Sequence, residues 1–422
     1  MTNILIFPAG TEIGKEIYYA LRHDKHINIT LAGSDYDSHA RHCACAYHVI
    51  PDIAQPNWLD ALQQLLQLEK IDYIFPAHDD ALLALSEKRD ALSATVLCPP
   101  HETCHTTRYK SKTYQSLRKI LPVPAVYTDS NKITQWPVFV KPDRGQGAQG
   151  ASCIETPEAL ASLLAQQSDL IVCEYLSGDE YTVDCFSDRD RGLLFCQPRT
   201  RSRIRAGIAM TSRLVTLEHV EEYARAISDR FHMRGAWFFQ LKRAATDELT
   251  LLEVAPRIAG TMALNRVNGI NFPLLTVYEA MRKKIALLPV CKELQITRSL
   301  SNQYKHSIQF QHVYIDYDDT VIINDKLCLL VITFLYQCIN HGISIHLITR
   351  HAGDIHLELN TRRISMLFDS IIHLDKDAKK SDWIKQQNSI FIDDSFSERM
   401  EVFNAKEIPT FDINMLELLI RD

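Results

Sequence analysis

The first hundred residues alternate short apolar strands with helices. Strands are expected at residues 3–7, 27–31 and 71–75, and helices at residues 15–22 and 58–68. Strands that alternate with helices predict a parallel sheet covered by helices. The chain is therefore expected to be a multidomain α/β protein that opens with an α/β domain at residues 1–100.

Two turns of this first domain bear on its ligands. The turn with Gly10 and Gly14 departs from the dinucleotide fingerprint G-x-G-x-x-G, which argues against an NAD site. Asp79 and Asp80 lie just beyond the strand at residues 71–75. They are either ligand-binding residues at the carboxyl end of the sheet or partners of the positive end of the helix that they begin.

A glycine-rich stretch follows a strand in the middle of the chain. Residues 137–140 are apolar, and Lys141 is followed by Gly145, Gly147 and Gly150. Glycine lets backbone N–H groups approach phosphate oxygens, and a Lys at a strand end supplies a positive charge. Because the Lys precedes the glycines, the stretch is not a G-x-x-x-x-G-K-[ST] loop. It is either a polyphosphate-binding loop or an ordinary hairpin turn.

More strands follow on both sides of a basic run. Residues 170–176 and 181–186 are expected to form one hairpin, and residues 235–242 and 249–255 another. Between them, Arg residues alternate at positions 199, 201, 203 and 205. On a strand these side chains would share one face. That face either lines a site for phosphate or carboxylate or is solvated.

The order of these motifs resembles the ATP-grasp superfamily, in particular its carbamoyl-phosphate-synthetase-like and amino-acid-ligase branches. The motifs are a helix that begins at Lys110, Val140-Lys-Pro142 with its glycine-rich loop, Glu174-Tyr-Leu-x-Gly-x-Glu180-Tyr, Gln240 on a strand, and Glu253-Val-Ala-Pro-Arg257. The resemblance implies an α+β ATP-grasp domain at residues 101–290, with the domain at residues 1–100 as the α/β domain that precedes it.

The resemblance also implies ATP and Mg²⁺ as cofactors and gives individual residues a role. Lys110 and Lys141 would hold the ATP phosphates, with Lys112 as a competitor of Lys110, and Gly145, Gly147 and Gly150 would cover them. Adenine and ribose would meet Glu174, Tyr175, Leu176 and Glu180. Gln240 and Glu253 would hold Mg²⁺, and Arg257 would stabilise the transferring phosphoryl group.

One position departs from the family pattern. The family usually has Glu-x-Asn-Pro-Arg with the Asn as a further metal ligand, and here that position is Ala255. Either water or another acid completes the metal shell, or only one Mg²⁺ binds tightly. The implied reaction converts a small-molecule carboxylate into an acyl phosphate, which an amine or a similar nucleophile then attacks.

The last part of the chain carries polar residues at successive strand ends. Residues 291–306 are polar and lack periodicity, which predicts a linker. One strand then ends in Asp316-x-Asp318-x-Thr320, another in Thr349 and a third in Asp393-Asp394, while Lys379 and Lys380 precede a helix. Two carboxylates two residues apart can act as nucleophile and general acid/base. The alternative is an acidic loop or a bare cation site.

This second set resembles the haloacid-dehalogenase-like phosphatase superfamily over residues 307–422. The resemblance implies a Rossmann-like domain with a minimal cap and a phosphorylated metabolite as substrate. Asp316 would form an aspartyl phosphate, Asp318 would be the acid/base, and Thr349 would contact the phosphoryl oxygens. Lys380 (or Lys379) would neutralise the nucleophile and phosphate, and Asp393 with Asp394 would hold Mg²⁺ alongside Asp316 and the carbonyl of Asp318.

The composition limits which binding partners and which cellular compartment are expected. The net charge of −6 argues against nucleic acid, and the longest apolar run, residues 327–339, is too short to span a membrane. The 11 Cys without paired spacing indicate a reduced, cytoplasmic protein. A Cys43-x-Cys45 pair near His39, His42 and His48 fits no zinc pattern but leaves a metal site open.

The sequence therefore predicts a bifunctional enzyme, an ATP- and Mg²⁺-dependent ligase fused to a phosphatase that shares a metabolite with it. The alternative, favoured by Ala255, is a nucleotide-binding module that regulates an active phosphatase. A third hypothesis is carboxylation or carbamoylation with bicarbonate as the acid. A homo-oligomer is compatible with each of them.

Overall fold

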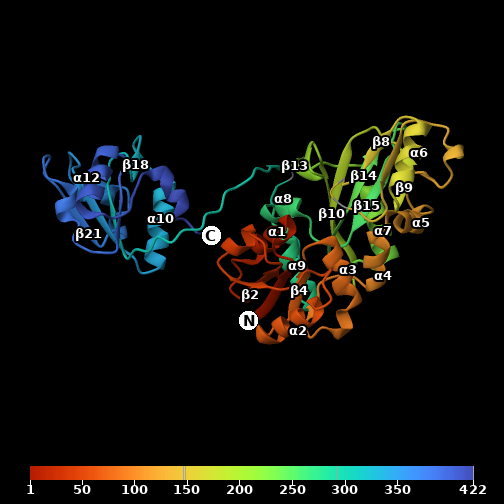
Figure 1. Cartoon of the computed structure of the whole chain (residues 1–422), viewed down its shortest axis with the longest axis horizontal. Helices are drawn as coiled ribbons and strands as arrows, with labels where there is room; N and C mark the ends of the chain where they lie inside the picture. The colour runs from red at the N-terminus through yellow and green to blue at the C-terminus, as the bar shows by residue number, and fades with distance from the viewer. Residues whose placement is uncertain (146, 148, 292, 422) are drawn as a thin grey trace. The chain divides into compact units, whose positions relative to one another are not determined.

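A computed structural model describes residues 1–145, 147, 149–291 and 293–421 of the chain. The described residues form two units, residues 1–301 and residues 302–422, which Figure 1 colours from red to green and in blue. Gln146 and Ala148 of the predicted phosphate loop and Lys292 of the predicted linker lie outside the described residues.

The strands of the first unit are β1 (Thr2–Phe7), β2 (Ile27–Gly33), β3 (Ala46–Val49), β4 (Tyr73–Pro76), β5 (Thr95–Val96), β6 (Val126–Tyr127), β7 (Val138–Pro142), β8 (Ser152–Ile154), β9 (Leu170–Glu174), β10 (Glu180–Asp188), β11 (Gly192–Thr200), β12 (Arg203–Arg205), β13 (Ile208–Arg213), β14 (Gly235–Arg243), β15 (Leu249–Ala255) and β16 (Gln295–Thr297). Its α-helices are α1 (Glu12–Leu21), α2 (Trp58–Leu68), α3 (Asp79–Glu87), α4 (His101–Arg108), α5 (Lys110–Leu117), α6 (Pro157–Gln166), α7 (Val220–Phe231), α8 (Ala263–Val267) and α9 (Phe272–Ala280). Short 3₁₀ turns are η1 (His39–His42), η2 (Arg89–Ala91), η3 (Ser130–Lys132) and η4 (Gly260–Met262).

The predicted parallel sheet at the N-terminus is present. Its strand order is β3-β2-β1-β4-β5, with every pairing parallel. Side chains of β1 alternate between two cores: Ile4 and Ile6 pack with Ile17 of α1, while Leu5 and Phe7 pack with the apolar face of α2. The chain leaves β1 toward β2 and returns beside β1 with β4. The carboxyl ends of β1 and β4 therefore form the switch point at which open α/β sheets bind ligands.

Two antiparallel sheets follow. The first has the order β6-β9-β7-β8 and packs Val138, Val140 and Val172 against Leu160 of α6. The second has the order β11-β10-β14-β15, and α7 packs on one of its faces. Figure 1 shows β10, β14 and β15 side by side. The predicted β14–β15 hairpin is confirmed by its antiparallel pairing.

The predicted hairpin of residues 170–176 with residues 181–186 is wrong. Strand β9 pairs with β6 and β7, and β10 pairs with β11 and β14, so the two strands belong to different sheets. The turn between them thus carries the chain from one sheet to the other. Both segments are apolar enough to be covered on both faces, and that pattern does not specify which partner a strand takes.

The predictions for the basic run and the linker need correction as well. Arg199 lies in β11, Arg201 lies in the connection between β11 and β12, and Arg203 and Arg205 belong to β12, so the four Arg side chains do not share one strand face. The segment predicted as a linker contains β16, which pairs with β13 and completes the sheet β12-β13-β16. The first unit accordingly extends to residue 301.

The second unit is built on another parallel sheet, in the order β21-β20-β17-β22-β23. Val313 and Ile315 of β17 face the core with α10, and Tyr314 between them faces the core with α12, so helices cover both faces. The strands are β17 (His312–Ile315), β18 (Ile322–Ile323), β19 (Lys326–Leu327), β20 (Ser344–Thr349), β21 (Ser370–His373), β22 (Ser389–Ile392) and β23 (Thr410–Phe411). The helices are α10 (Leu329–Asn340), α11 (Ile355–Thr361) and α12 (Phe396–Lys406), with 3₁₀ turns η5 (Ser365–Leu367), η6 (Lys380–Trp383) and η7 (Ile413–Leu418).

The apolar run at residues 327–339 becomes the amphipathic helix α10. Val331, Phe334 and Leu335 are buried in the core, whereas Leu329 and Tyr336 are exposed. Within the described residues, no helix has the length and apolar character that crossing a membrane requires.

Candidate active sites

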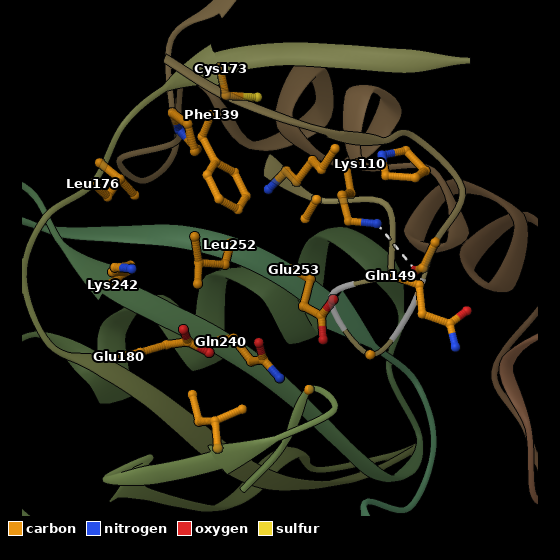
Figure 2. A pocket seen from close by; sticks show the side chains of 18 of the residues that line it. Lys110, Phe139, Gln149, Cys173, Leu176, Glu180, Gln240, Lys242, Leu252 and Glu253 are labelled. Atoms are coloured by element: carbon orange, nitrogen blue, oxygen red, sulfur yellow. Dashed lines mark hydrogen bonds between the residues drawn. The ribbon is translucent and has the colours of Figure 1, made fainter. Parts of the chain in front are cut away.

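The two antiparallel sheets of the first unit enclose a cavity of about 180 Å³. Phe139 of β7 enters it from one sheet and Leu252 of β15 from the other, as Figure 2 shows. Cys173 and Leu176 extend the apolar lining, and Lys110, Gln240 and Glu253 supply charged and polar groups at another part of the wall. An apolar slot joined to a polar end fits a ligand with a flat base and a charged tail.

Lys110 and Lys141 both line this cavity, and each ammonium group is held by neutral oxygen atoms. Lys110 Nζ donates to the carbonyl oxygen of Gly145 at 3.2 Å, and Lys141 Nζ donates to Tyr114 Oη at 2.8 Å. Among the described residues, no carboxylate lies within ion-pair distance of either ammonium group. Burial lowers the pKa of both groups. An anionic ligand would supply the missing countercharge.

The structure separates Lys110 from its predicted competitor Lys112. The side chain of Lys112 is exposed, its Nζ lies 3.3 Å from His105 Nε2, and it stacks over the ring of Tyr109. Lys112 does not belong to the described lining of the cavity, whereas Lys110 does.

The glycine-rich loop meets a second loop over the cavity. Gly145 and Gly147 line it, and so does Gly207 at the tip of the β12–β13 hairpin. Gly207 and Gly147 adopt positive φ angles of 74° and 61°. A Cβ atom on Gly207 would lie 2.2 Å from the carbonyl carbon of Gly147, so the two backbones touch. Gly150 also has a positive φ angle but does not belong to the described lining.

The residues predicted to meet adenine and ribose lie at one side of the same cavity. Glu174 and Leu176 line it, and Glu174 Oε2 accepts a hydrogen bond from the backbone N–H of Ala125 at 3.0 Å. Tyr175 is exposed and does not belong to the described lining. Glu180 lines the cavity with its carboxylate 2.6 Å from Arg201 Nε. Arg201 in turn donates to the carbonyl oxygen of Gly207 at 2.9 Å and so ties Glu180 to the hairpin tip.

Gln240 and Glu253 lie directly opposite each other on neighbouring strands. They form a register pair of β14 and β15, and both side chains point into the cavity in Figure 2. An amide and a carboxylate oxygen suit Mg²⁺, which commonly completes its shell with water and substrate phosphates. Ala255, two residues after Glu253, lines the adjoining cavity and offers no ligand atom. The residues present therefore fit a metal that takes its remaining ligands from water or from a bound phosphate.

The adjoining cavity, of about 320 Å³, lies beside the switch point of the N-terminal sheet. Thr11 and Asp79, which follow β1 and β4, line it together with Glu253 and Arg257. Arg257 donates to both carboxylate oxygens of Asp79, at 2.6 and 2.7 Å. Asp80 accepts instead from Arg108 and Arg144. Both aspartates are thus partners of arginines as well as residues at a helix N-terminus.

The second unit brings three of the predicted strand-end residues into direct contact. Asp316 and Asp393 follow the neighbouring strands β17 and β22, and Lys380 Nζ lies 2.6 Å from a carboxylate oxygen of each. Burial raises the pKa of Asp316 to about 7, despite the opposing effect of Lys380. Lys379 is exposed, so Lys380 is the lysine that faces the carboxylates.

Asp394 completes a group of acids that could hold a cation. Ligand atoms of Asp316, Asp393 and Asp394 all lie within 4.8 Å of one another. Within the described ranges, no other group of His, Cys, Asp and Glu has such spacing, and the stretch with Cys43 and Cys45 does not form one. Acid oxygens are the ligands that Mg²⁺ prefers.

The remaining predicted residues surround this group. Thr349 is buried at the end of β20, the neighbour of β17 on its other side, and accepts a hydrogen bond from the backbone N–H of His351. Asp318 is exposed, and His351 Nδ1 lies 2.9 Å from its carboxylate.

Sequence reasoning missed several residues of both sites. In the first unit these are Tyr114 and Arg298, and in the second unit His351 and Arg350, which anchors the carbonyl of Ala378 before Lys380. His351 lies two residues after Thr349, a spacing that could have drawn attention to it. Nothing in the sequence pointed to Arg298 as a site residue, because it lies in the segment predicted to be a linker.

Comparisons with known families agree with this architecture. Residues 4–97 match the family described as PylC-like, N-terminal domain, and residues 166–300 match the family described as ATP-grasp in the biosynthetic pathway with Ter operon. No curated protein matches the chain. Neither family segment extends past residue 300, so they say nothing about the second unit.

Solved structures share the fold of the first unit at low sequence identity. The biotin carboxylase domain of 2-oxoglutarate carboxylase from Hydrogenobacter thermophilus, solved with MgADP and bicarbonate, is 15% identical with a TM-score of 0.57, over 68% of this chain and 71% of that one. L-amino acid ligase from Bacillus licheniformis is 15% identical with a TM-score of 0.55, over 67% and 74%. N5-carboxyaminoimidazole synthetase from Staphylococcus aureus, complexed with ADP, is 15% identical with a TM-score of 0.54, over 71% and 82%. The chain therefore contains a domain of the ATP-grasp superfamily, preceded by a PylC-like N-terminal domain.

Proposed function

We propose that the first unit is an ATP- and Mg²⁺-dependent ligase that activates a carboxylate as an acyl phosphate and joins it to an amine or a similar nucleophile. The observation that carries this proposal is the pair Lys110 and Lys141, two ammonium groups without a described carboxylate partner, on the wall that also presents Gln240 and Glu253. Such a set neutralises polyphosphate and holds a metal between its oxygens. Similar structures that were solved with ADP support the assignment of this cavity to a nucleotide.

Each part of the site would serve one step. Phe139, Leu176 and Leu252 would hold the base, and Glu180 the ribose. Lys110, Lys141 and the glycine-rich loop would bind the phosphates, while Gln240 and Glu253 would hold the Mg²⁺ that neutralises the transferring phosphoryl group. The adjoining cavity next to Glu253 and Arg257 would receive the carboxylate substrate.

ADP release by the full chain, with Mg²⁺ and a panel of carboxylates paired with amines, tests this proposal. Bicarbonate belongs in the panel because one similar structure was solved with that anion. We expect acceptor-dependent ADP release that Glu253→Gln abolishes and Lys112→Met leaves unchanged. ATP binding without turnover by any pair would favour the alternative, a nucleotide-binding regulatory module, which the missing ligand at Ala255 supports.

We further propose that the second unit is a phosphatase of the haloacid-dehalogenase-like type. Its support is the group of Asp316, Asp393 and Lys380 with Asp394 nearby, at the carboxyl ends of adjacent strands. Asp316 would attack the phosphorus atom and form an aspartyl phosphate, with Mg²⁺ and Lys380 neutralising the oxygens. Asp318 would protonate the leaving group and then activate the water, with His351 orienting its carboxylate.

Hydrolysis of p-nitrophenyl phosphate by the full chain tests the second activity. We expect Mg²⁺-dependent hydrolysis that Asp316→Asn abolishes while ADP release stays at the wild-type rate. Asp319→Asn is the matched control, because Asp319 is exposed in the same turn and lacks a role in the proposed site. Retained hydrolysis in Asp316→Asn would contradict the aspartyl phosphate, and loss of ADP release would contradict two independent activities.

A further inference from the structure

The cavity of about 320 Å³ beside the proposed phosphate site is strongly basic. The described residues of its lining include the arginines Arg108, Arg199, Arg201, Arg257 and Arg298. Its volume lies within the range of small-molecule pockets. Which of these guanidinium groups a substrate can recruit depends on how firmly each is held by its own acid.

Most of these arginines are held by shielded carboxylates. Asp184, the partner of Arg199, is fully buried, and Asp79, the partner of Arg257, is 13% exposed. Glu180 and Asp80 hold Arg201 and Arg108 and are 21% and 30% exposed. Removing a shielded carboxylate from a guanidinium group leaves a charge without compensation, which is costly.

Arg298 is paired differently. Its partner is Glu12, whose side chain is 49% exposed, the most exposed acid among these described pairs, while Arg298 itself is 18% exposed. The backbone of Arg298 is fixed, because its N–H donates to the carbonyl oxygen of Met210 at 2.7 Å directly after β16. Glu12 begins α1, and both residues line the cavity. A solvated ion pair contributes little to stability, so a ligand can separate its members at small cost.

We infer that the ion pair of Arg298 and Glu12 is the binding subsite for an α-amino acid, whose carboxylate binds Arg298 and whose ammonium group binds Glu12. An α-amino acid carries opposite charges on two groups attached to the same carbon atom, and Arg298 and Glu12 present opposite charges in direct contact. The guanidinium plane matches a carboxylate through two parallel hydrogen bonds. For its place in a reaction, the inference rests on the proposed ligase function.

Ligands with only one of these charges fit less well. A simple carboxylate that took Arg298 would leave Glu12 unpaired beside a second anion, and a simple amine would leave Arg298 unpaired. The other acids of the described lining are engaged, since Asp79 is bound by Arg257 and Glu253 faces the proposed metal site. Glu12 is thus the acid best placed to receive an ammonium group.

Calorimetric titration of the full chain, with Mg²⁺ and a non-hydrolysable ATP analogue, tests the subsite without turnover. The probes are the twenty standard L-amino acids, each compared with its decarboxylated amine and its deaminated acid. We expect at least one amino acid to bind and either truncated form to bind at least about tenfold more weakly. Failure of all twenty to bind, or equal binding of a truncated form, overturns the inference.

Variants assign the binding to the two residues. Arg298→Met and Glu12→Gln should each weaken the binding of the amino acid at least about tenfold. Arg298→Lys should weaken this binding less, because it removes only one of the two hydrogen bonds. Arg203→Met is the matched control, since Arg203 is exposed on β12 and outside the described lining. Unchanged affinity for the ATP analogue shows that each variant is folded. Equal amino-acid binding by Arg298→Met and the wild type overturns the subsite.

This design separates the two proposals. If an amino acid binds through Arg298 but no co-substrate yields ADP, the subsite stands and the ligase proposal fails. If ADP release proceeds with other acids and amines while no amino acid binds, the ligase proposal stands and the subsite fails.

Discussion

Gly207 and Gly147 are in backbone contact, so closely that a Cβ atom added to Gly207 would lie 2.2 Å from the carbonyl carbon of Gly147. Gly207 is at the tip of the β12–β13 hairpin, and Gly147 belongs to the loop after β7. Two loops from different sheets therefore close over one cavity, and the contact leaves no room for a side chain.

Replacing Gly207 with alanine should separate these loops. The added methyl group meets backbone, which cannot move as a flexible side chain can, and the φ angle of 74° is unfavourable for alanine. We expect Gly207→Ala to weaken ATP binding at least about tenfold, an effect of 1.4 kcal/mol or more, in calorimetric titrations. Gly192→Ala is the control, because Gly192 has a φ angle of 70° but a Cβ atom there would lie 3.9 Å from its nearest neighbour. Equal losses in both variants would show that backbone strain alone is responsible.

Lys141→Met should weaken the binding of ATP without unfolding the first unit. The Lys141 ammonium is buried, has no described carboxylate partner, and costs desolvation energy when the nucleotide is absent. We expect at least about a tenfold loss in ATP affinity together with an unchanged or higher melting temperature. Lys112→Met should change neither quantity. A parallel loss of melting temperature and affinity in Lys141→Met would mean that Lys141 is structural.

Lys380→Met should destabilise the second unit, and Mg²⁺ should reverse part of the loss. The variant leaves Asp316 and Asp393, both buried, without their shared countercharge. Breaking such a buried group costs about 3–5 kcal/mol. Hydrogen exchange of peptides from residues 302–422, measured on the full chain, should show faster exchange that slows when Mg²⁺ is added. Lys379→Met, with an exposed side chain, should exchange like the wild type. Faster exchange that does not change when Mg²⁺ is added would argue against a metal bound to Asp316 and Asp393.

The ion pair of Asp79 and Arg257 should make the first unit sensitive to acid. Burial raises the pKa of the Asp79 carboxyl, but the bound Arg257 guanidinium more than reverses this effect, so the pKa lies below its ordinary value. A depressed pKa contributes stability above the unfolded-state pKa of about 3.9, and this contribution is lost as the pH falls through the folded-state pKa.

Urea unfolding between pH 7 and pH 3 measures this contribution. Asp79→Asn should lower the free energy of unfolding by about 3 kcal/mol at pH 7, and the difference from the wild type should shrink toward pH 3. Asp80→Asn should cost less, because Asp80 is more exposed than Asp79. A difference that is the same at pH 3 and pH 7 would contradict the assignment to this ion pair.

Several elements follow from local pattern alone. Helix α2 has the bounds predicted for it, α5 begins at the predicted Lys110, and β17, β20 and β22 end where polar residues follow an apolar run. In a parallel sheet the carboxyl ends of adjacent strands share an edge, so Asp316 and Asp393 meet once β17 and β22 pair. The roles predicted for these residues remain predictions.

The sequence by itself determined many of the strands and helices, because periodicity and turn chemistry are local properties. The resemblance of its motifs to known families identified Lys110, Lys141, Glu253, Asp316 and Lys380 as candidates. Only the tertiary structure decided that β9 and β10 belong to different sheets, that Asp79 pairs with Arg257, and that Arg298 meets Glu12. The partners in these two ion pairs are separated by 178 and 286 residues. Such contacts depend on which buried faces pack together, and no local pattern encodes that choice.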